Sequence, residues 1–310
     1  MIKLATNPRA KRLMQNSRRM TDLANRFVGG QSVEEVLARS EHLLQQGKKS
    51  SLFYLGEYVR DQNEISKTRD ELESAIKELA LKNIDLHISV DPTQIGLMNS
   101  VSDFSSNGKR LSQLVQEHSP GDPTSSDFVM IDMEDTSVTQ ATLDVYHDLH
   151  SKGLPCGVTL QAYLHRTESD LQQIIESGGK VRLVKGAFAE PESIAFTRRK
   201  EIDQSYFELA RKMLSDQAKR TSFYPVFGTH DDVMIDKIIT YATEHGWAPD
   251  TYEFEFLLGV RESLQDSLVK RGHKLRLYVP FGTEWWAYSV RRVGESPRNG
   301  VFLLRSLFFR

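Results

Sequence analysis

Cysteine is almost absent from this 310-residue chain, where Cys156 is the single example. One cysteine excludes an internal disulfide and any metal site that needs several thiolates, so we expect Cys156 to be a small buried apolar residue. Long hydrophobic runs are missing as well. No stretch of about 18 apolar residues occurs, and the N-terminal MIKLATNPRAKRL has no continuous apolar segment. These absences predict a cytoplasmic protein.

The chain also has no large excess of acidic or basic residues, because its net charge is only −2. No overall field therefore favours nucleic acid as a partner. No GxGxxG motif follows an early apolar run, which argues against a Rossmann dinucleotide domain. No set of His, Asp and Glu recurs at strand ends with the character of metal ligands, so we predict no metal site.

The chain does contain eight short apolar runs that alternate with longer helical patterns, which is typical of repeated βα units. The expected strands are 51–56, 85–90, 127–133, 156–161, 181–187, 223–229, 252–258 and 274–279. The expected helices between them include 64–82, 139–152, 168–177, 198–216, 231–246 and 261–271. Eight alternations in about 260 residues favour a closed (βα)8 barrel over a doubly wound sheet.

Two segments flank or interrupt this pattern. Residues 1–49 are expected to form an N-terminal helical arm, with the barrel domain at 50–310, and Ser32 followed by Glu35 indicates a capping box at a helix start. The stretch 105–127 is rich in Ser, Gly and Pro. We predict that it is a polar loop over the mouth or an edge of the barrel.

Four residues near the C-terminus share one face of an expected helix, because Tyr288, Arg291, Arg292 and Glu295 fall at i, i+3, i+4 and i+7. Two guanidiniums taken out of water need an anionic partner, and their forked donors match a carboxylate. The pattern favours a site for the carboxylate of a small acid. A solvated helix face with ordinary surface pairs is the alternative.

Charged residues also stand at the expected ends of barrel strands, where the working residues of such barrels gather. Arg182 and Lys185 bracket two aliphatic residues in RLVKGA, which places cations where a loop meets an anionic cofactor. Plain solubilisation of a strand end is the alternative. Asp132 closes the third expected strand, and a buried carboxylate there needs a partner.

Two of these motifs carry a family resemblance. YVPFGTEWWAYSVRRVGE resembles the C-terminal signature of the proline dehydrogenase family, of the monofunctional bacterial type, and RLVKGA is similar to a motif of its fourth strand. The resemblance covers residues 50–305 and implies FAD-dependent oxidation of L-proline to pyrroline-5-carboxylate. It also implies a distorted (βα)8 TIM barrel with N-terminal helices and a final helix over the barrel mouth. A quinone or another electron acceptor would take the electrons, which leaves a peripheral contact with the inner membrane open.

The same resemblance implies a role for each matching residue. Asp132 lies beside the reacting centre, and Arg182 approaches the flavin N5 edge. Arg291 and Arg292 hold the substrate carboxylate, and Glu295 keeps that pair in place. The ring of the substrate packs against Tyr278, Tyr288 and Leu257. The remaining cofactor contacts are Met133, Gln161, Lys185, Gly186, Ala187, Thr229 and His230.

Three positions depart from the family pattern. Asp91 stands where the family has a lysine, Phe53 where it has an acidic residue, and Phe188 where it has a tyrosine. A carboxylate at position 91 would repel a substrate carboxylate nearby. Loss of the acid and of the lysine could be a compensated exchange, or Asp91 could recognise a cationic or hydroxylated group on another substrate.

The sequence is therefore consistent with three functions. The first is oxidation of L-proline, and the second is the same flavin chemistry on another cyclic or secondary amine. The third is a flavin-free barrel that binds small acids.

Overall fold

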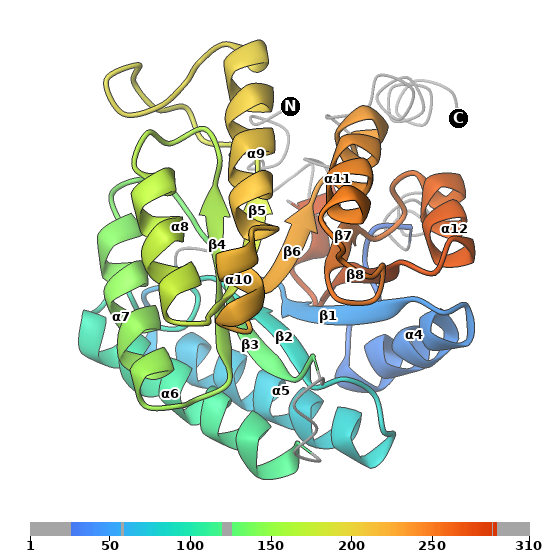
Figure 1. The fold of residues 1–310 in the computed structure, drawn as a ribbon. Helices are drawn as coiled ribbons and strands as arrows, with labels where there is room; N and C mark the ends of the chain where they lie inside the picture. The colour runs from blue at the N-terminus through green and yellow to red at the C-terminus, as the bar shows by residue number, and fades with distance from the viewer. Residues whose placement is uncertain (1–25, 57–58, 120–125, 287, 290–310) are drawn as a thin grey trace, which may run out of the picture.

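Parallel strands close into a barrel at the centre of the computed structural model, which describes residues 26–56, 59–119, 126–286 and 288–289 (Figure 1). The eight strands follow one another around the barrel in chain order, and β8 pairs back onto β1. The strands are β1 (Lys49–Tyr54), β2 (His87–Val90), β3 (Phe128–Ile131), β4 (Cys156–Gln161), β5 (Lys180–Val184), β6 (Tyr224–Gly228), β7 (Glu253–Leu257) and β8 (Lys274–Phe281). The predicted (βα)8 barrel is confirmed.

Helices surround the strands in the order expected for βα units (Figure 1). They are α4 (Val33–Gln45), α5 (Gln62–Leu81), α6 (Val101–His118), α7 (Thr139–Ser151), α8 (Thr167–Glu176), α9 (Arg199–Met213), α10 (Asp216–Arg220), α11 (Asp232–Glu244) and α12 (Glu262–Lys270). None of the helices in the described ranges is long and apolar enough to cross a membrane.

Alternation along each strand divides the side chains between two environments. Aliphatic residues such as Ile88, Val158 and Leu183 belong to the large apolar core that the strands share with the helices. The intervening residues, such as Ser89, Thr159 and Arg182, are polar and buried, and they contact one another across the barrel interior. Cys156 is buried in the apolar core, as predicted.

The start of α4 confirms most of the predicted capping box. The hydroxyl of Ser32 accepts a hydrogen bond from the backbone N–H of Glu35. The carboxylate of Glu35 turns back and accepts the N–H of Gln31 at 2.7 Å, one residue before the position that a full capping box uses. The division into an arm at 1–49 and a barrel domain at 50–310 stays a prediction.

The loop predicted over 105–127 is wrong for its larger part, because α6 runs through residue 118. Phe104, Leu111 and Val115 recur at helical spacing and are fully buried. Ser100 caps the helix by accepting the N–H of Asp103 at 3.0 Å. The many small polar residues masked this apolar stripe, which is only one residue wide per turn.

Other boundaries also differ from the prediction, and β8 continues to Phe281 instead of ending at residue 279. The strand expected over 181–187 ends at Val184, because Gly186 adopts a φ of +105°, outside the range of a strand. RLVKGA also begins on β5, the fifth strand of this barrel, and not on a fourth strand. The helix expected over 198–216 is α9, which ends at Met213 and is followed by the separate α10.

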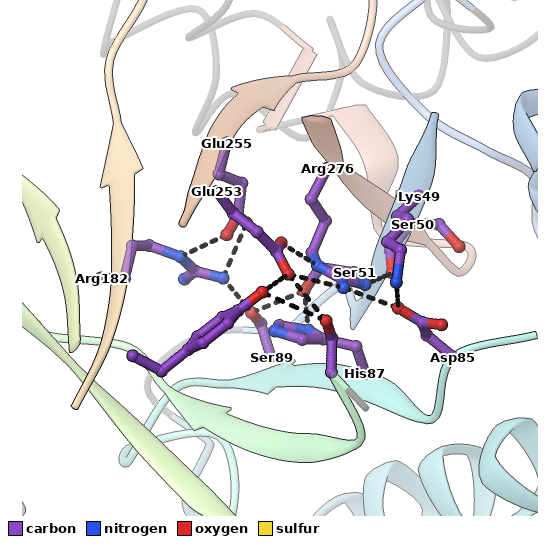
Figure 2. Close-up of polar contacts among 12 residues, drawn as sticks. Lys49, Ser50, Ser51, Asp85, His87, Ser89, Arg182, Glu253, Glu255 and Arg276 are labelled. Atoms are coloured by element: carbon purple, nitrogen blue, oxygen red, sulfur yellow. Dashed lines mark hydrogen bonds and ion pairs between the residues drawn. The ribbon is translucent and has the colours of Figure 1, made fainter. Parts of the chain in front are cut away.

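A buried guanidinium organises one end of the barrel interior (Figure 2). Arg276 is fully buried and donates to both carboxylate oxygens of Glu253, at 2.7 and 3.1 Å. It also donates to Asp85 at 2.8 Å and to the carbonyl of Ser50 at 2.7 Å, while Lys49 donates to Asp85 at 2.7 Å. Burial alone would raise the pKa of Glu253, but the charge and hydrogen bonds of Arg276, the hydroxyl of Tyr224 and the charge of Lys49 together lower that pKa to about 2.

Replacing Arg276 therefore tests how strongly this charge holds the barrel together. Arg276→Met is expected to lower the free energy of unfolding by about 3–5 kcal/mol, because it leaves a buried carboxylate unpaired. Urea denaturation measures the change. Arg198→Met is the control: the side chain of Arg198 is 81% exposed, so the loss should be about 0–1 kcal/mol. Equal losses in the two variants would contradict this account of Arg276.

Candidate functional site

Two adjoining cavities lie where the carboxyl ends of the strands meet. The larger has a volume of about 650 Å³ and the smaller about 300 Å³. Their shared lining residues are Met133, Val184, Gly228, His230 and Leu257. The larger cavity is lined further by Gln161, the segment Lys185–Phe188, Arg199, the segment Thr229–Asp232 and Arg261. The smaller is lined further by Asp91, Asp132, Thr159, Arg182, Glu255, Phe256 and Tyr278. The two cavities therefore lie side by side.

Arg182 lines the smaller cavity, and every one of its five N–H donors has a partner. Its Nε and Nη2 donate to the two carboxylate oxygens of Glu255 at 2.8 and 2.7 Å. Its Nη1 donates to Asp132 and, at 3.4 Å, to Thr159. The second donor of Nη2 goes to Ser89 at 2.7 Å. Arg182 therefore has no donor left over for a ligand carboxylate in this arrangement.

The charges around Arg182 are not balanced, because two buried carboxylates face one guanidinium. Burial raises the pKa of Asp132 and that of Glu255, although Arg182 pulls both in the opposite direction. The contrast with Glu253, whose pKa falls to about 2 beside Arg276, follows from the number of cations available. The smaller cavity has an excess of negative charge and favours a cationic guest.

Tyr278 lines this cavity and packs against a neighbouring cluster of aromatic side chains. Tyr278 donates its hydroxyl to Asp132 at 2.9 Å, and its ring lies 5.2 Å from that of Phe53. Burial raises the pKa of Tyr278 strongly, and the charges of Asp132 and Asp91 raise it further. Tyr288 is buried in an apolar cluster that contains Phe53 and packs against Tyr278. The structure thus brings Asp91, Asp132, Tyr278 and Tyr288 to one region.

Amide and imidazole groups shape the boundary between the two cavities. Gln161 donates its amide to the carbonyls of Met133 and Glu134, at 3.3 and 3.1 Å. Its carbonyl oxygen is buried and has no hydrogen-bond donor among the described residues. The Nε2 of His230 accepts the backbone N–H of Leu257 at 2.9 Å, so in the neutral ring the proton sits on Nδ1.

The loop after β5 forms one side of the larger cavity. Lys185 donates to Asp203 and, at 2.9 Å, to Asp231, which also caps α11. Gly186 has a φ of +105°, and a Cβ added there would lie 2.2 Å from the ring of Tyr163. This close approach requires glycine. Thr229 also lines the cavity, where its hydroxyl accepts the N–H of Asp231 at 3.2 Å.

The sequence-predicted residues divide into two groups. Those from the barrel converge on the two cavities or on the aromatic cluster beside them. Arg182, however, lines the smaller cavity and is absent from the lining of the larger one. Arg291, Arg292 and Glu295 lie outside the described residues.

Sequence reasoning missed the buried polar partners of Arg182, which are Ser89, Thr159 and Glu255. A signal for Glu255 was present, because Glu253 and Glu255 alternate with phenylalanines in YEFEF. In a barrel strand this alternation places the carboxylates on one face and the rings on the other.

The fold and the two cavities are those of a (βα)8 barrel enzyme with a cofactor-sized space beside a small charged pocket. A family model described as Proline dehydrogenase matches residues 36–305. The chain therefore belongs to the proline dehydrogenase family, a family of oxidoreductases that is generally flavin-dependent.

Similar proteins agree with this placement. Proline dehydrogenase 2 of Bacillus subtilis (strain 168) is 33% identical over 284 residues, which are 92% of this chain and 90% of the relative. Proline dehydrogenase of Deinococcus radiodurans is 28% identical over 311 residues, which are 99% and 96% of the two chains. The crystal structure of proline utilization A from Bdellovibrio bacteriovorus, inactivated by N-propargylglycine, superimposes with a TM-score of 0.80 at 22% identity. This chain spans 35% of that longer protein, and the likeness shows the shared fold.

The residues around the larger cavity fit a flavin. The unmatched buried carbonyl oxygen of Gln161 is an acceptor suited to a ring N–H. The glycine at position 186 keeps the loop backbone against Tyr163 and leaves no side chain there to enter the cavity.

Substituting Gly186 tests the shape of this loop. Gly186→Ala is expected to lower the free energy of unfolding by about 1–3 kcal/mol more than Gly153→Ala, because the added methyl overlaps the ring of Tyr163. Gly153 is the matched control, since it has a φ of +70° but no atom within 4 Å of an added Cβ. Thermal or urea unfolding of both variants measures the difference, and equal losses would refute the predicted overlap.

Proposed function

We propose that this protein oxidises L-proline to pyrroline-5-carboxylate, with FAD bound in the larger cavity and the substrate in the smaller one. The observation that carries the proposal is the shared wall of the two cavities, formed by Met133, Val184, Gly228, His230 and Leu257. It would place a cofactor next to a small substrate, as a hydride transfer requires. The family and the relatives from Bacillus and Deinococcus support the same activity.

The cofactor would be held by residues that line the larger cavity. These are Met133, Gln161, Lys185, Gly186, Ala187, Thr229 and His230. When bound, FAD supplies the hydride acceptor that no side chain can provide. Arg182 contributes positive charge from the neighbouring cavity, where it is held by Asp132 and Glu255.

The substrate would be oriented by its charges and by its ring. The excess negative charge around Asp132 and Glu255 attracts the ring ammonium. The nitrogen must be neutral when hydride leaves the neighbouring carbon, and Asp132 is the proposed acceptor of its proton because burial raises the pKa of that carboxyl. Tyr278, Tyr288 and Leu257 would contact the ring. Arg291 and Arg292, supported by Glu295, would bind the carboxylate.

The reaction passes two electrons from the substrate to the cofactor, so a second acceptor must remove them. A quinone or another acceptor would serve, and we propose a cytoplasmic protein that meets it at the inner membrane surface.

Anaerobic titration of the purified protein with L-proline tests the proposal. The oxidised flavin absorbance is expected to bleach stoichiometrically, because the substrate transfers its hydride without another oxidant. A colourless protein with no flavin after denaturation would favour the flavin-free barrel that binds small acids. A yellow protein that L-proline leaves unbleached would retain the cofactor assignment and reject L-proline as substrate.

Asp91 supports a second candidate, which is the same oxidation of another cyclic or secondary amine. Asp91 lines the smaller cavity together with Asp132 and Glu255, and Arg182 is the one arginine or lysine in the described lining. A ring that carries a second ammonium or a hydroxyl would be a better partner for this cavity than the unsubstituted ring of proline.

The charge of Asp91 can be removed without changing its shape. Asp91→Asn is expected to lower the KM for L-proline about tenfold, because the carboxylate of Asp91 would no longer repel the substrate carboxylate that Arg291 and Arg292 are proposed to bind. Steady-state kinetics with L-proline measures the change, and Asp148→Asn, at an exposed ion pair on α7, is the control. A higher KM in Asp91→Asn, with faster turnover of an amino-substituted proline by the parent, would favour the second candidate.

A further inference from the structure

A chain of three buried side chains runs from Arg182 into the barrel interior. The Nη2 of Arg182 donates to the hydroxyl of Ser89 at 2.7 Å. The hydroxyl of Ser89 lies 3.0 Å from that of Ser51, which lies 2.9 Å from Nδ1 of His87. All three residues have no exposed surface, and Figure 2 shows them between the guanidiniums of Arg182 and Arg276.

The positive charge of Arg182 fixes the direction of these hydrogen bonds. A guanidinium only donates, so the oxygen of Ser89 accepts from it. If Ser89 then donates to Ser51, and Ser51 to His87, each hydroxyl both accepts and donates once. The reverse direction would leave the hydrogen of Ser89 with no acceptor among the described residues and Nε2 of His87 with no donor, whereas the forward direction leaves only the Nε2–H of His87 without an acceptor there. Each unmatched group is costly at a buried site, so the forward direction is favoured.

His87 is suited to end this chain as an acceptor. Burial lowers its pKa, and the charges of Arg276, Arg182 and Lys49 lower it further, so the ring is neutral at neutral pH. Its proton then sits on Nε2, and Nδ1 receives the hydrogen of Ser51. The ring of Phe128 packs against the imidazole with centroids 4.3 Å apart and holds it in place.

Ser89 differs from the other partners of Arg182 in one respect that matters for binding. Asp132, Thr159 and Glu255 all line the smaller cavity, so a cation that enters this cavity competes with Arg182 for the carboxylates. Ser89 does not line the cavity and carries no charge to share. Its contact with Arg182 therefore persists when a substrate ammonium draws on Asp132 and Glu255.

We propose that Ser89, Ser51 and neutral His87 form a one-way hydrogen-bond relay that holds the guanidinium of Arg182 in place while the substrate is bound. The three are positioning residues that act through Arg182. This inference rests on the proposed oxidation of L-proline for its kinetic consequence, but the direction of the relay does not.

Kinetics with a matched set of variants tests the consequence. Ser89→Ala and His87→Leu are expected to lower kcat/KM for L-proline about tenfold, since each removes a hydrogen bond on which a charged group depends. His87→Asn should stay close to the parent, because its amide oxygen lies near the position of Nδ1 and can accept from Ser51. Ser112→Ala is the control, since Ser112 is fully buried on α6 and its hydroxyl has no partner among the described residues.

The flavin reduction potential, measured by spectroelectrochemistry, separates positioning from simple loss of stability. Ser89→Ala and His87→Leu are expected to shift it to more negative values, because a displaced cation stabilises the reduced flavin less. Ser112→Ala should leave it unchanged. If the parent is active and Ser89→Ala and His87→Leu match Ser112→Ala in both kcat/KM and potential, the relay positions nothing and the inference is overturned.

Nitrogen-15 NMR of the histidine side chains tests the relay without reference to catalysis. His87, assigned by the signal that disappears in His87→Asn, is expected to be neutral with its proton on Nε2 at pH 7. A proton on Nδ1 would reverse the direction of the chain and overturn the inference. A parent that neither holds flavin nor oxidises L-proline would refute the proposed function, and the NMR result would still decide the direction of the relay.

Discussion

Two buried guanidiniums organise the interior of this barrel, because each of them needs carboxylate partners. Arg276 on β8 and Arg182 on β5 each bind a glutamate of β7 through two hydrogen bonds, Glu253 in one case and Glu255 in the other. A (βα)8 barrel commonly fills these layers with branched aliphatic side chains. In this barrel, charged side chains occupy these positions instead. The facing strands must therefore keep their register, because a shift would leave buried ions unpaired.

Both layers are built from buried ion pairs, but they differ in the ratio of cations to carboxylates. Arg276 and Lys49 balance Glu253 and Asp85, and the pKa of each of these carboxylates falls to about 2. Arg182 faces both Asp132 and Glu255, and the pKa of each is raised by burial. The balanced layer, with Arg276 at its centre, holds strands of the barrel together. The unbalanced layer can respond to a cation or a proton, and it lies at the cavity where a substrate would enter.

Much of this architecture could be read from the sequence, because short apolar runs alternate along the chain with longer helical patterns. The barrel, Asp132 at the end of β3 and the glycine after β5 were all visible in this way. The helix α6 was not, since serines and a glycine hid the narrow stripe of Phe104, Leu111 and Val115. The network of Arg182 was hidden for a different reason. Its partners Ser89, Thr159 and Glu255 come from strands far apart in the chain, and only barrel closure brings them together.

That network also limits how an amino acid can bind. All five donors of Arg182 are occupied by protein groups, so this cation cannot hold the substrate carboxylate without giving up a buried partner. The described lining of the smaller cavity otherwise holds the carboxylates Asp91, Asp132 and Glu255. A zwitterion can enter such a cavity only with its ammonium directed toward these groups and its carboxylate toward cations from elsewhere. Arg291 and Arg292, predicted on one helix face, would supply those cations, so the acidic cavity and the arginine pair together would impose a single orientation on the substrate.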